Sequence, residues 1–328
     1  MRQILFLRPV WAVNASFVKR DQEILSRHYQ LTLLSYQEGD RLFFLRVIKH
    51  LRDKDICYVW FGGIHSFWAL AAARLLGKKV VIVAGGYDAV YMPEIGYGLK
   101  YENKGWRRTY FAFRHVDRVL AFSDSSRQSI TKISRTIDVR TVVLGFESER
   151  FMPTGQKRDM VLTVGHVNRS NVRRKGFETF VRVAAKMPEL KFVIAGHHND
   201  DSVNYLRSIS MSNTEFTGYL PDSEILALMQ RAKIYAQLSA HEGFGCALAE
   251  AMLCECTPVV TNSGAIPEVA GPDALYVDYG DTDATVNAIR QALSVESGAK
   301  YRERITELFP IEKREKELCR IIDPLIRT

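Results

Sequence analysis

Short apolar runs alternate with segments of helical periodicity along most of the chain. In the first half, the runs that predict strands occupy residues 3–7, 31–35, 56–61, 79–84, 118–123 and 141–144. The segments that predict helices lie between them, at residues 16–27, 43–52, 66–76 and 125–134. Strands that alternate with helices form parallel sheets covered by helices, and buried parallel strands are continuous apolar runs. The alternation therefore predicts an α/β fold.

A polar segment at residues 151–159 interrupts this alternation. The charge balance changes across it, because residues 1–153 carry 24 Lys and Arg against 14 Asp and Glu, whereas residues 154–328 carry 21 against 23. The pattern then restarts, with predicted strands at 160–164, 191–195 and 233–238 and predicted helices at 177–185 and 223–231. A chain of 328 residues can bury two cores of ordinary size. We predict two domains, residues 1–153 and 154–328.

Two glutamates flank a glycine-containing turn between the predicted strand 233–238 and a predicted helix at 246–253. Glu242 precedes Gly243 and Gly245, and Glu250 lies about one turn into the helix. The amides and dipole at a helix N-terminus favour a phosphate, and the two carboxylates can accept hydrogen bonds from separate sets of sugar hydroxyls. This layout suits a nucleotide sugar. The alternative is a surface glutamate followed by a solvated helix position.

The segment continues through the next predicted strand and loop, which contain Thr257-Pro258-Val259-Val260 and Gly264-Ala265-Ile266-Pro267-Glu268. The whole run resembles the EGFG…EA…PVV…G-x-PE block of retaining GT-B glycosyltransferases of the GT4 type. The resemblance implies two Rossmann-like domains whose parallel sheets face a central cleft. It implies that residues 1–153 bind the acceptor and residues 154–328 the nucleotide-sugar donor. The final helix, about 310–328, is expected to return to the N-terminal domain.

A basic loop follows the first strand of the second domain, at residues 164–177. Lys175-Gly176 matches the KG element of the family, whose Lys and Arg stabilise the leaving diphosphate. His166 occupies the usual place of the arginine. The candidates to replace that arginine are Arg169, Arg173 and Arg174, of which we favour Arg169. The alternative is a solvated basic loop.

The resemblance also assigns roles to the two glutamates, with Glu242 binding hydroxyls of the donor sugar and Glu250 the ribose. The predicted catalytic residues are Glu242, Lys175, Arg169 and Asp88. The predicted donor-binding residues are Glu250, Gly243, Phe244, Gly245, Cys246, Ala247, Gly165, His166, His197, Tyr219 and Leu220. A glycosidase with paired carboxylates is the rival interpretation of the glutamates, but it does not explain Lys175-Gly176.

Asp88 lies in a glycine-containing loop after the buried strand 79–84. Relatives carry a His or Asp near this place that contacts the donor sugar or the acceptor. The alternative for Asp88 is a turn-capping aspartate. Gly62-Gly63 is predicted to form a second glycine turn after a strand, in a similar position at the cleft. It is a weaker candidate for a functional role than Asp88.

No cofactor or metal is predicted. Lys175, a nearby arginine and the helix amides can neutralise the leaving group without a metal. Asp281-Thr282-Asp283 has the Asp-x-Asp pattern of metal-dependent transferases, but it precedes a predicted helix at 284–293 and is interpreted as a helix cap. The five cysteines are scattered, which favours free thiols.

The predicted partners are a nucleotide-sugar donor and a sugar or lipid-linked acceptor. Basic segments with interleaved apolar residues, at 41–54 and 100–118, suit an anionic membrane surface or, alternatively, core-packing helices with a solvated basic face. No motif supports nucleic-acid binding. No run is long enough to span a membrane and no signal peptide is evident, so we expect a cytoplasmic protein. A peripheral position on the inner membrane face is the option that the basic segments add. Two alternatives are an epimerase or hydrolase of nucleotide sugars and an inactive binding protein.

Overall fold

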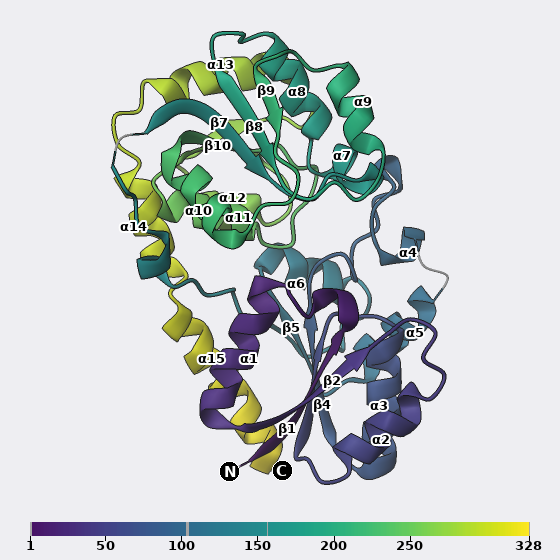
Figure 1. Cartoon of the computed structure of the whole chain (residues 1–328). Coiled ribbons are helices and arrows are strands. Elements are labelled where there is room, and N and C mark those ends of the chain that lie inside the picture. Colours follow the sequence, from purple (N-terminus) through teal and green to yellow (C-terminus); the bar gives the residue numbers. More distant parts are fainter. Residues whose placement is uncertain (1, 103–104, 156, 328) are drawn as a thin grey trace. The chain divides into compact units, whose positions relative to one another are not determined.

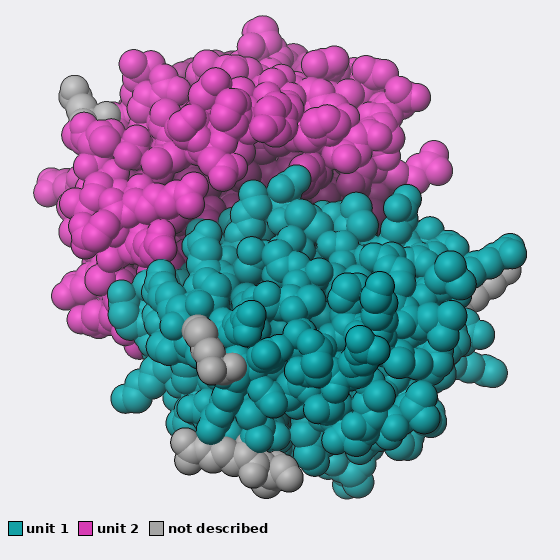
Figure 2. All heavy atoms as spheres, turned by 60° about the horizontal axis from the view of Figure 1, so that its bottom comes forward, with its two compact units in different colours: residues 1–145, 311–328 teal, residues 146–310 magenta. Residues whose placement is uncertain are grey.

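A computed structural model describes residues 2–102, 105–155 and 157–327. The chain forms two compact units, residues 1–145 with 311–328 and residues 146–310 (Figure 2). No helix within the described residues is long and apolar enough to cross a bilayer. Residues 103 and 104 of the basic segment 100–118, and residue 156 of the predicted linker, lie outside the described residues.

The first unit contains a six-stranded parallel sheet of order β2-β1-β3-β4-β5-β6. Its strands are β1 (Gln3–Pro9), β2 (Gln30–Tyr36), β3 (Ile56–Trp60), β4 (Lys79–Ala84), β5 (Arg118–Ala121) and β6 (Val139–Thr141). Its helices are α1 (Ser16–His28), α2 (Phe43–Leu51), α3 (Ile64–Leu76), α4 (Leu99–Glu102), α5 (Trp106–His115), α6 (Asp124–Thr131) and α15 (Ile311–Arg327), with short 3-10 turns at Val10–Ala12 and Pro93–Ile95. Helices α1 and α15 pack together, as do α2, α3 and α5 (Figure 1). The central strands β3 and β4 are therefore buried and apolar.

The second unit repeats this architecture with the strand order β12-β11-β10-β7-β8-β9, again parallel throughout. Its strands are β7 (Arg158–Val164), β8 (Lys191–Ala195), β9 (Thr214–Phe216), β10 (Ala232–Gln237), β11 (Thr257–Thr261) and β12 (Leu275–Val277). Its helices are α7 (Arg169–Arg174), α8 (Phe177–Ala185), α9 (Ser202–Ser208), α10 (Asp222–Arg231), α11 (Cys246–Leu253), α12 (Ile266–Ala270), α13 (Thr282–Leu293) and α14 (Ala299–Leu308), with a 3-10 turn at Ser148–Phe151. The two parallel sheets confirm the predicted fold class.

Two local predictions are wrong. The strand predicted at 141–144 lies earlier, as β6, because it pairs with β5 through Val139 to Thr141. The loop predicted after β7 contains the helix α7, which Asn168 caps by accepting a hydrogen bond from the Asn171 amide at 2.9 Å.

The final helix, α15, belongs to the first unit, as predicted. Its apolar side buries Leu318 and Ile322 completely. Its Arg314 is also buried and forms a bidentate ion pair with Asp21 of α1. Arg314 Nε lies 2.5 Å from Asp21 Oδ1, and Nη2 lies 2.8 Å from Oδ2. The Arg314 guanidinium also donates to the carbonyls of Val142 and Val143. The helix is thus fixed to both α1 and the segment that follows β6.

We predict that Arg314→Leu lowers the free energy of unfolding by about 3–5 kcal/mol, because it leaves the buried Asp21 carboxylate without its cation. Urea denaturation followed by circular dichroism measures the change. The control is Arg320→Leu on the same helix, which removes an exposed pair with Glu317 and should cost less than about 1 kcal/mol. Equal losses in the two variants would contradict the prediction.

Candidate functional site

The strand order of the second unit places a switch point between β7 and β10. From β7 the sheet grows in one direction through β8 and β9, and in the other through β10, β11 and β12. The loops after β7 and β10 therefore leave the sheet in opposite directions from adjacent strand ends. Ligands of open parallel sheets bind in the crevice that forms there. The predicted Lys175 and Glu242 lie on these two loops.

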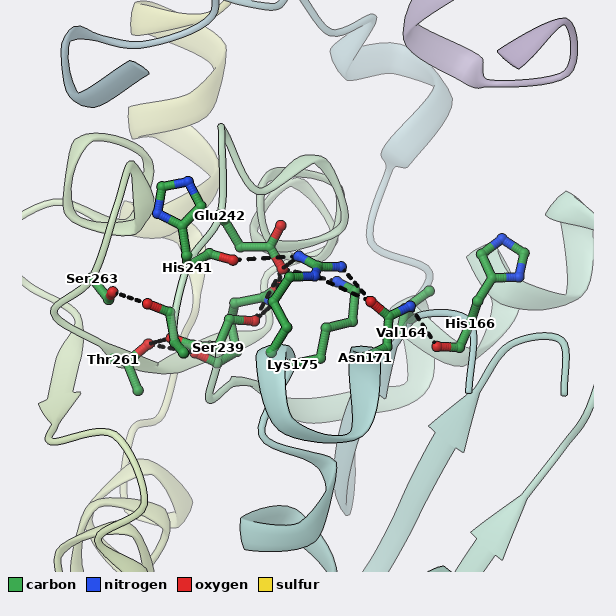
Figure 3. A network of polar contacts seen from close by, with 12 residues as sticks. Val164, His166, Asn171, Lys175, Ser239, His241, Glu242, Thr261 and Ser263 are labelled. Atoms are coloured by element: carbon green, nitrogen blue, oxygen red, sulfur yellow. Dashed lines mark hydrogen bonds and ion pairs between the residues drawn. The ribbon is translucent and has the colours of Figure 1, made fainter. Parts of the chain in front are cut away.

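The Glu242 carboxylate joins the two loops through four partners (Figure 3). Its Oε1 atom lies 2.9 Å from Lys175 Nζ and 3.2 Å from Arg174 Nη1. The same atom accepts hydrogen bonds from Ser239 Oγ at 3.0 Å and Gln237 Nε2 at 3.1 Å. Among the described residues no hydrogen bond or ion pair involves Oε2, which points away from the cluster in Figure 3. One oxygen is thus saturated, and the other has none of these polar partners.

The charges of this cluster determine its protonation. Burial by itself would raise the pKa of Glu242, but the charges of Lys175 and Arg174 outweigh burial and lower the pKa to about 2. Burial lowers the pKa of Lys175, and the Glu242 charge opposes that shift. At neutral pH the carboxylate is ionised. Two cations beside one carboxylate leave a net positive charge, which suits an anionic ligand.

Two glycines allow close approaches on either side of Lys175. A Cβ atom at Gly165 would lie 2.6–2.7 Å from the Lys175 Cδ and Cε atoms, so the lysine stem passes directly over the end of β7. Gly176 adopts φ +68°, and a Cβ atom there would collide with the carbonyl of Leu238. The backbone after Lys175 therefore packs on the segment after β10. The Ala240 amide also donates to the Arg174 carbonyl at 2.7 Å.

The structure brings Arg174, rather than Arg169, to Glu242. The Arg174 guanidinium is oriented by Asn171 Oδ1, which accepts from Nη2 at 2.8 Å, and it also donates to the His241 carbonyl. Arg169 is exposed, and its backbone amide donates to Asp200. The Arg169 side chain lines a separate pocket of about 610 Å³ beside α9. The other residues of that pocket are Val172, Arg173, Glu178, Asp200, Asp201, Ser202 and Tyr205.

The turn before α11 has the expected form. Gly245 caps the helix with φ +102°, so Cys246 and Ala247 begin its first turn and Gly243 precedes it. Phe244 is buried and its ring packs against those of Phe146 and Phe309, so this side chain anchors the turn. Glu250 is half-buried in the helix.

The remaining predicted donor-binding residues gather at the ends of the neighbouring strands. His166 follows β7, His197 follows β8, and their rings lie 6.3 Å apart. The ring of Tyr219, after β9, lies 6.4 Å from that of His197 and is 71% exposed. Leu220 is half-buried beside it. Burial lowers the pKa of His166, and the neighbouring His197 lowers it further.

Asp88 lies in the first unit and is 1% exposed. Its carboxylate accepts hydrogen bonds from the amides of Gly62 at 2.7 Å, Gly86 at 3.0 Å and Gly85 at 3.2 Å. Burial raises its pKa to about 6, although these amides oppose the shift. The aspartate therefore ties together the turns after β3 and β4. This geometry is that of the turn-capping alternative.

The Asp281-Thr282-Asp283 segment has the geometry of a helix cap. The Asp281 side chain accepts from the Ala284 amide at 2.9 Å at the start of α13, and Asp283 pairs with Lys186 at 2.6 Å. Within the described residues no group of three or more His, Cys, Asp or Glu side chains is arranged to bind a metal ion.

Arg174, Gln237 and Ser239 are not among the predicted catalytic residues. The sequence offers Arg174 only as one of three substitutes, because its pattern does not reveal the helix α7. The other two lie on β10 or directly after it, where polar residues in a buried strand are the available signal.

Sequence comparison places the second unit among known proteins. Residues 147–308 match the profile of the family described as glycosyl transferases group 1. One subunit of the phosphatidylinositol N-acetylglucosaminyltransferase of Arabidopsis thaliana is 25% identical over 238 residues, which cover 69% of this chain and 51% of that protein. The serotype-specific mannosyltransferase WbdA of Escherichia coli is 24% identical over 203 residues, 57% of this chain and 24% of that protein. The chain thus spans about half or less of the length of these curated relatives.

Solved structures resemble the whole chain. Anabaena Alr3699/HepE, crystallised in complex with UDP and glucose, has a TM-score of 0.81 and 15% identity, and the match covers 99% of this chain and 100% of that chain. The apo lipopolysaccharide outer core galactosyltransferase WaaB has a TM-score of 0.71 and 14% identity, with 98% and 99% covered. At these identities the likeness shows the fold alone.

We predict a pH-dependent contribution of Glu242 to stability. Because its folded pKa of about 2 lies below the ordinary 4.5, its charge stabilises the fold above pH 4.5, and this contribution is lost as the pH falls toward 2. The stability difference between the wild type and Glu242→Gln should shrink by roughly 2 kcal/mol between pH 5 and pH 3. Denaturant unfolding at each pH measures it. The exposed Glu189→Gln should show no such trend, and a flat profile for Glu242→Gln would refute the assignment.

Proposed function

The chain belongs to the glycosyl transferases group 1 family and has the GT-B fold, and we propose that it transfers a sugar from a nucleotide-diphosphate sugar to an acceptor hydroxyl. The observation that carries this proposal is the Glu242 cluster at the switch point of the second sheet. It combines a net positive charge with an available carboxylate oxygen, Oε2. A sugar diphosphate presents the complementary groups, an anion joined to a ring of hydroxyls.

The proposed reaction breaks the bond between the anomeric carbon and the diphosphate oxygen. The transition state carries positive charge on the sugar and negative charge on the departing diphosphate. Lys175, Arg174 and the first amides of α11 neutralise that diphosphate, so we propose that no metal is required. Glu242 binds donor-sugar hydroxyls through Oε2, and Glu250 binds the ribose. By family analogy, the acceptor attacks from the side that the diphosphate leaves, and configuration is retained.

We assign the diphosphate-binding arginine to Arg174 because it shares Glu242 with Lys175. Arg169 and Arg173 line the separate pocket beside α9. We therefore assign to Arg174 the role that the sequence predicted for Arg169.

The rings at the ends of β7, β8 and β9 are proposed to surround the nucleotide base. Tyr219 offers an exposed aromatic face, and His166 and His197 lie next to it. Because the pKa of His166 is lowered, its ring is neutral at neutral pH and suits a base better than a phosphate.

The acceptor is proposed to bind the first unit, at the corresponding switch point between β1 and β3. Trp11 follows β1, is 71% exposed and packs on Phe61 with 4.8 Å between ring centroids. Phe61 has φ +66°, a conformation that a non-glycine residue adopts at a cost and that is common at ligand sites. The Arabidopsis thaliana relative is named for a phosphatidylinositol reaction and WbdA as a serotype-specific mannosyltransferase, so a lipid-linked or polysaccharide acceptor is the proposed class.

Helix α2 and the residues before it suit an anionic membrane surface. Leu42 and Leu45 are 63% and 59% exposed, and exposed basic residues surround them. These basic residues are Arg41, Arg46, Lys49 and Arg52. An amphipathic helix with this composition binds by inserting its apolar residues while its cations meet lipid headgroups. We propose that this surface brings the protein to the inner face of a membrane.

The function is tested first by a thermal-shift screen against UDP-, GDP-, ADP- and dTDP-sugars, since a ligand that binds the folded state raises the melting temperature. With the donor so identified, Arg174→Met and Lys175→Met should each lower kcat/KM for transfer about 100-fold. Arg169→Met is the matched control and should change it less than about threefold. Equal effects of Arg169→Met and Arg174→Met would contradict the assignment.

The same assay distinguishes the alternatives. Turnover of the donor without any acceptor would favour a hydrolase or epimerase. Donor binding without turnover across a broad acceptor panel would favour an inactive binding protein.

We predict that replacing Leu42 and Leu45 together by Ser lowers binding to vesicles containing 30% phosphatidylserine at least fivefold, because it removes the apolar contact. Co-sedimentation with the vesicles measures binding, and neutral phosphatidylcholine vesicles should bind the wild type weakly. The control is Met211→Ser, which removes a residue of similar exposure in the second unit and should have no effect. Unchanged binding of the double variant would exclude this surface.

A further inference from the structure

Strand β10 carries buried polar side chains on one face. Tyr235 and Gln237 alternate along the strand, and Ser239 continues the alternation just after it. All three are between 0% and 1% exposed. Polar groups buried to this extent are costly unless they are hydrogen-bonded. Their bonds all lead toward Glu242.

The order of these bonds fixes the orientation of the Gln237 amide. The Val164 amide donates to the Tyr235 hydroxyl at 3.3 Å, and this hydroxyl donates in turn to Gln237 Oε1 at 3.3 Å. The NH2 group of Gln237 must therefore face the other way. It donates to Ser239 Oγ at 2.6 Å and to Glu242 Oε1 at 3.1 Å.

The two neutral donors on Glu242 differ from its two cations. Lys175 and Arg174 are shared, in the proposed function, between the carboxylate and the diphosphate of the donor. Gln237 and Ser239 are buried beneath the carboxylate. They can continue to bind Oε1 when the cations turn toward the diphosphate.

We propose that Gln237 is a positioning residue for the transfer reaction. It fixes Oε1 of Glu242 so that Oε2 is presented to the hydroxyls of the donor sugar. This inference rests on the proposed function, because it deepens the role given there to Glu242. Groups that orient a reacting or binding side chain are commonly as necessary as the side chain itself.

The test compares Gln237→Glu with Gln237→Leu across pH 5.5–8.5, using the donor identified by the thermal-shift screen. A glutamate at this place is buried beside another carboxylate, so the pair retains one proton at low pH and that proton restores a donor. We expect kcat/KM of Gln237→Glu to be at least tenfold below the wild type at pH 8.5 and to recover at least fivefold, relative to the wild type, by pH 5.5. Gln237→Leu cannot donate at any pH and should stay low throughout.

Two outcomes would overturn the proposal. One is wild-type kcat/KM in Gln237→Leu, and the other is the same relative pH profile in both variants. Thr257→Val controls for loss of a buried polar group in the same sheet, since Thr257 is 2% exposed and lies at the other end of the adjacent strand β11. It should retain wild-type kcat/KM and pH profile.

A readout without activity separates this proposal from the proposed function. If the wild type turns over no nucleotide sugar, the proposed function fails. The contact with Gln237 is then tested through the stability contributed by the Glu242 charge, taken as the difference between each protein and its Glu242→Gln counterpart. In Gln237→Leu this contribution should disappear at a higher pH than in the wild type, because one donor to the carboxylate is lost. An unchanged midpoint would overturn the proposal.

Discussion

A carboxylate removed from water must recover from its surroundings the interactions it has lost, and the Glu242 site is organised by that requirement. Two cations and two neutral donors converge on its Oε1 atom, and they come from both loops at the switch point. The segment after β7 must therefore supply cations to this carboxylate, and it does so with Arg174 and Lys175. The requirement also explains the two glycines, since Gly165 lets the lysine stem pass and Gly176 lets the backbone approach Leu238.

The contrast with Asp88 shows how much the cations matter. Both carboxylates are buried and accept several hydrogen bonds, but the donors that approach Asp88 are the backbone amides of three glycines. Burial therefore prevails and raises the pKa of Asp88 to about 6, whereas Lys175 and Arg174 lower that of Glu242 to about 2. Neutral donors position a carboxylate, and full charges keep it ionised. Neutral donors alone, as at Asp88, suit a carboxylate that holds two turns together. Neutral donors combined with cations, as at Glu242, suit a site that binds an anion.

The alternation of strand and helix signals is sufficient to predict the parallel sheets. The resemblance to the family singles out Lys175-Gly176 and Glu242, and the strand and turn signals place them at strand ends. The sequence is not sufficient to select the arginine. Asn168 is a good helix cap, and a helix starting at Arg169 places Arg169 and Arg173 on one face and turns Arg174 by about 100° toward Glu242. Without that helix, the three arginines are equivalent. Gln237 escapes prediction for another reason: its importance lies in bonds to residues that only the folded sheet brings together.

The charged and the neutral partners of Glu242 are suited to different tasks. One carboxylate beside two cations retains a net positive charge. In the proposed function, an incoming diphosphate therefore takes over part of the charge compensation that Glu242 gives to Lys175 and Arg174. When the cations turn toward the phosphates, as the proposed function requires, the carboxylate depends increasingly on its hydrogen bonds from Gln237 and Ser239. The proposed donor sugar then meets an ionised oxygen, Oε2, because Gln237 and Ser239 hold Oε1 and the diphosphate does not attract these neutral groups. In this proposal, the neutral donors orient the carboxylate and the two cations bind the anion.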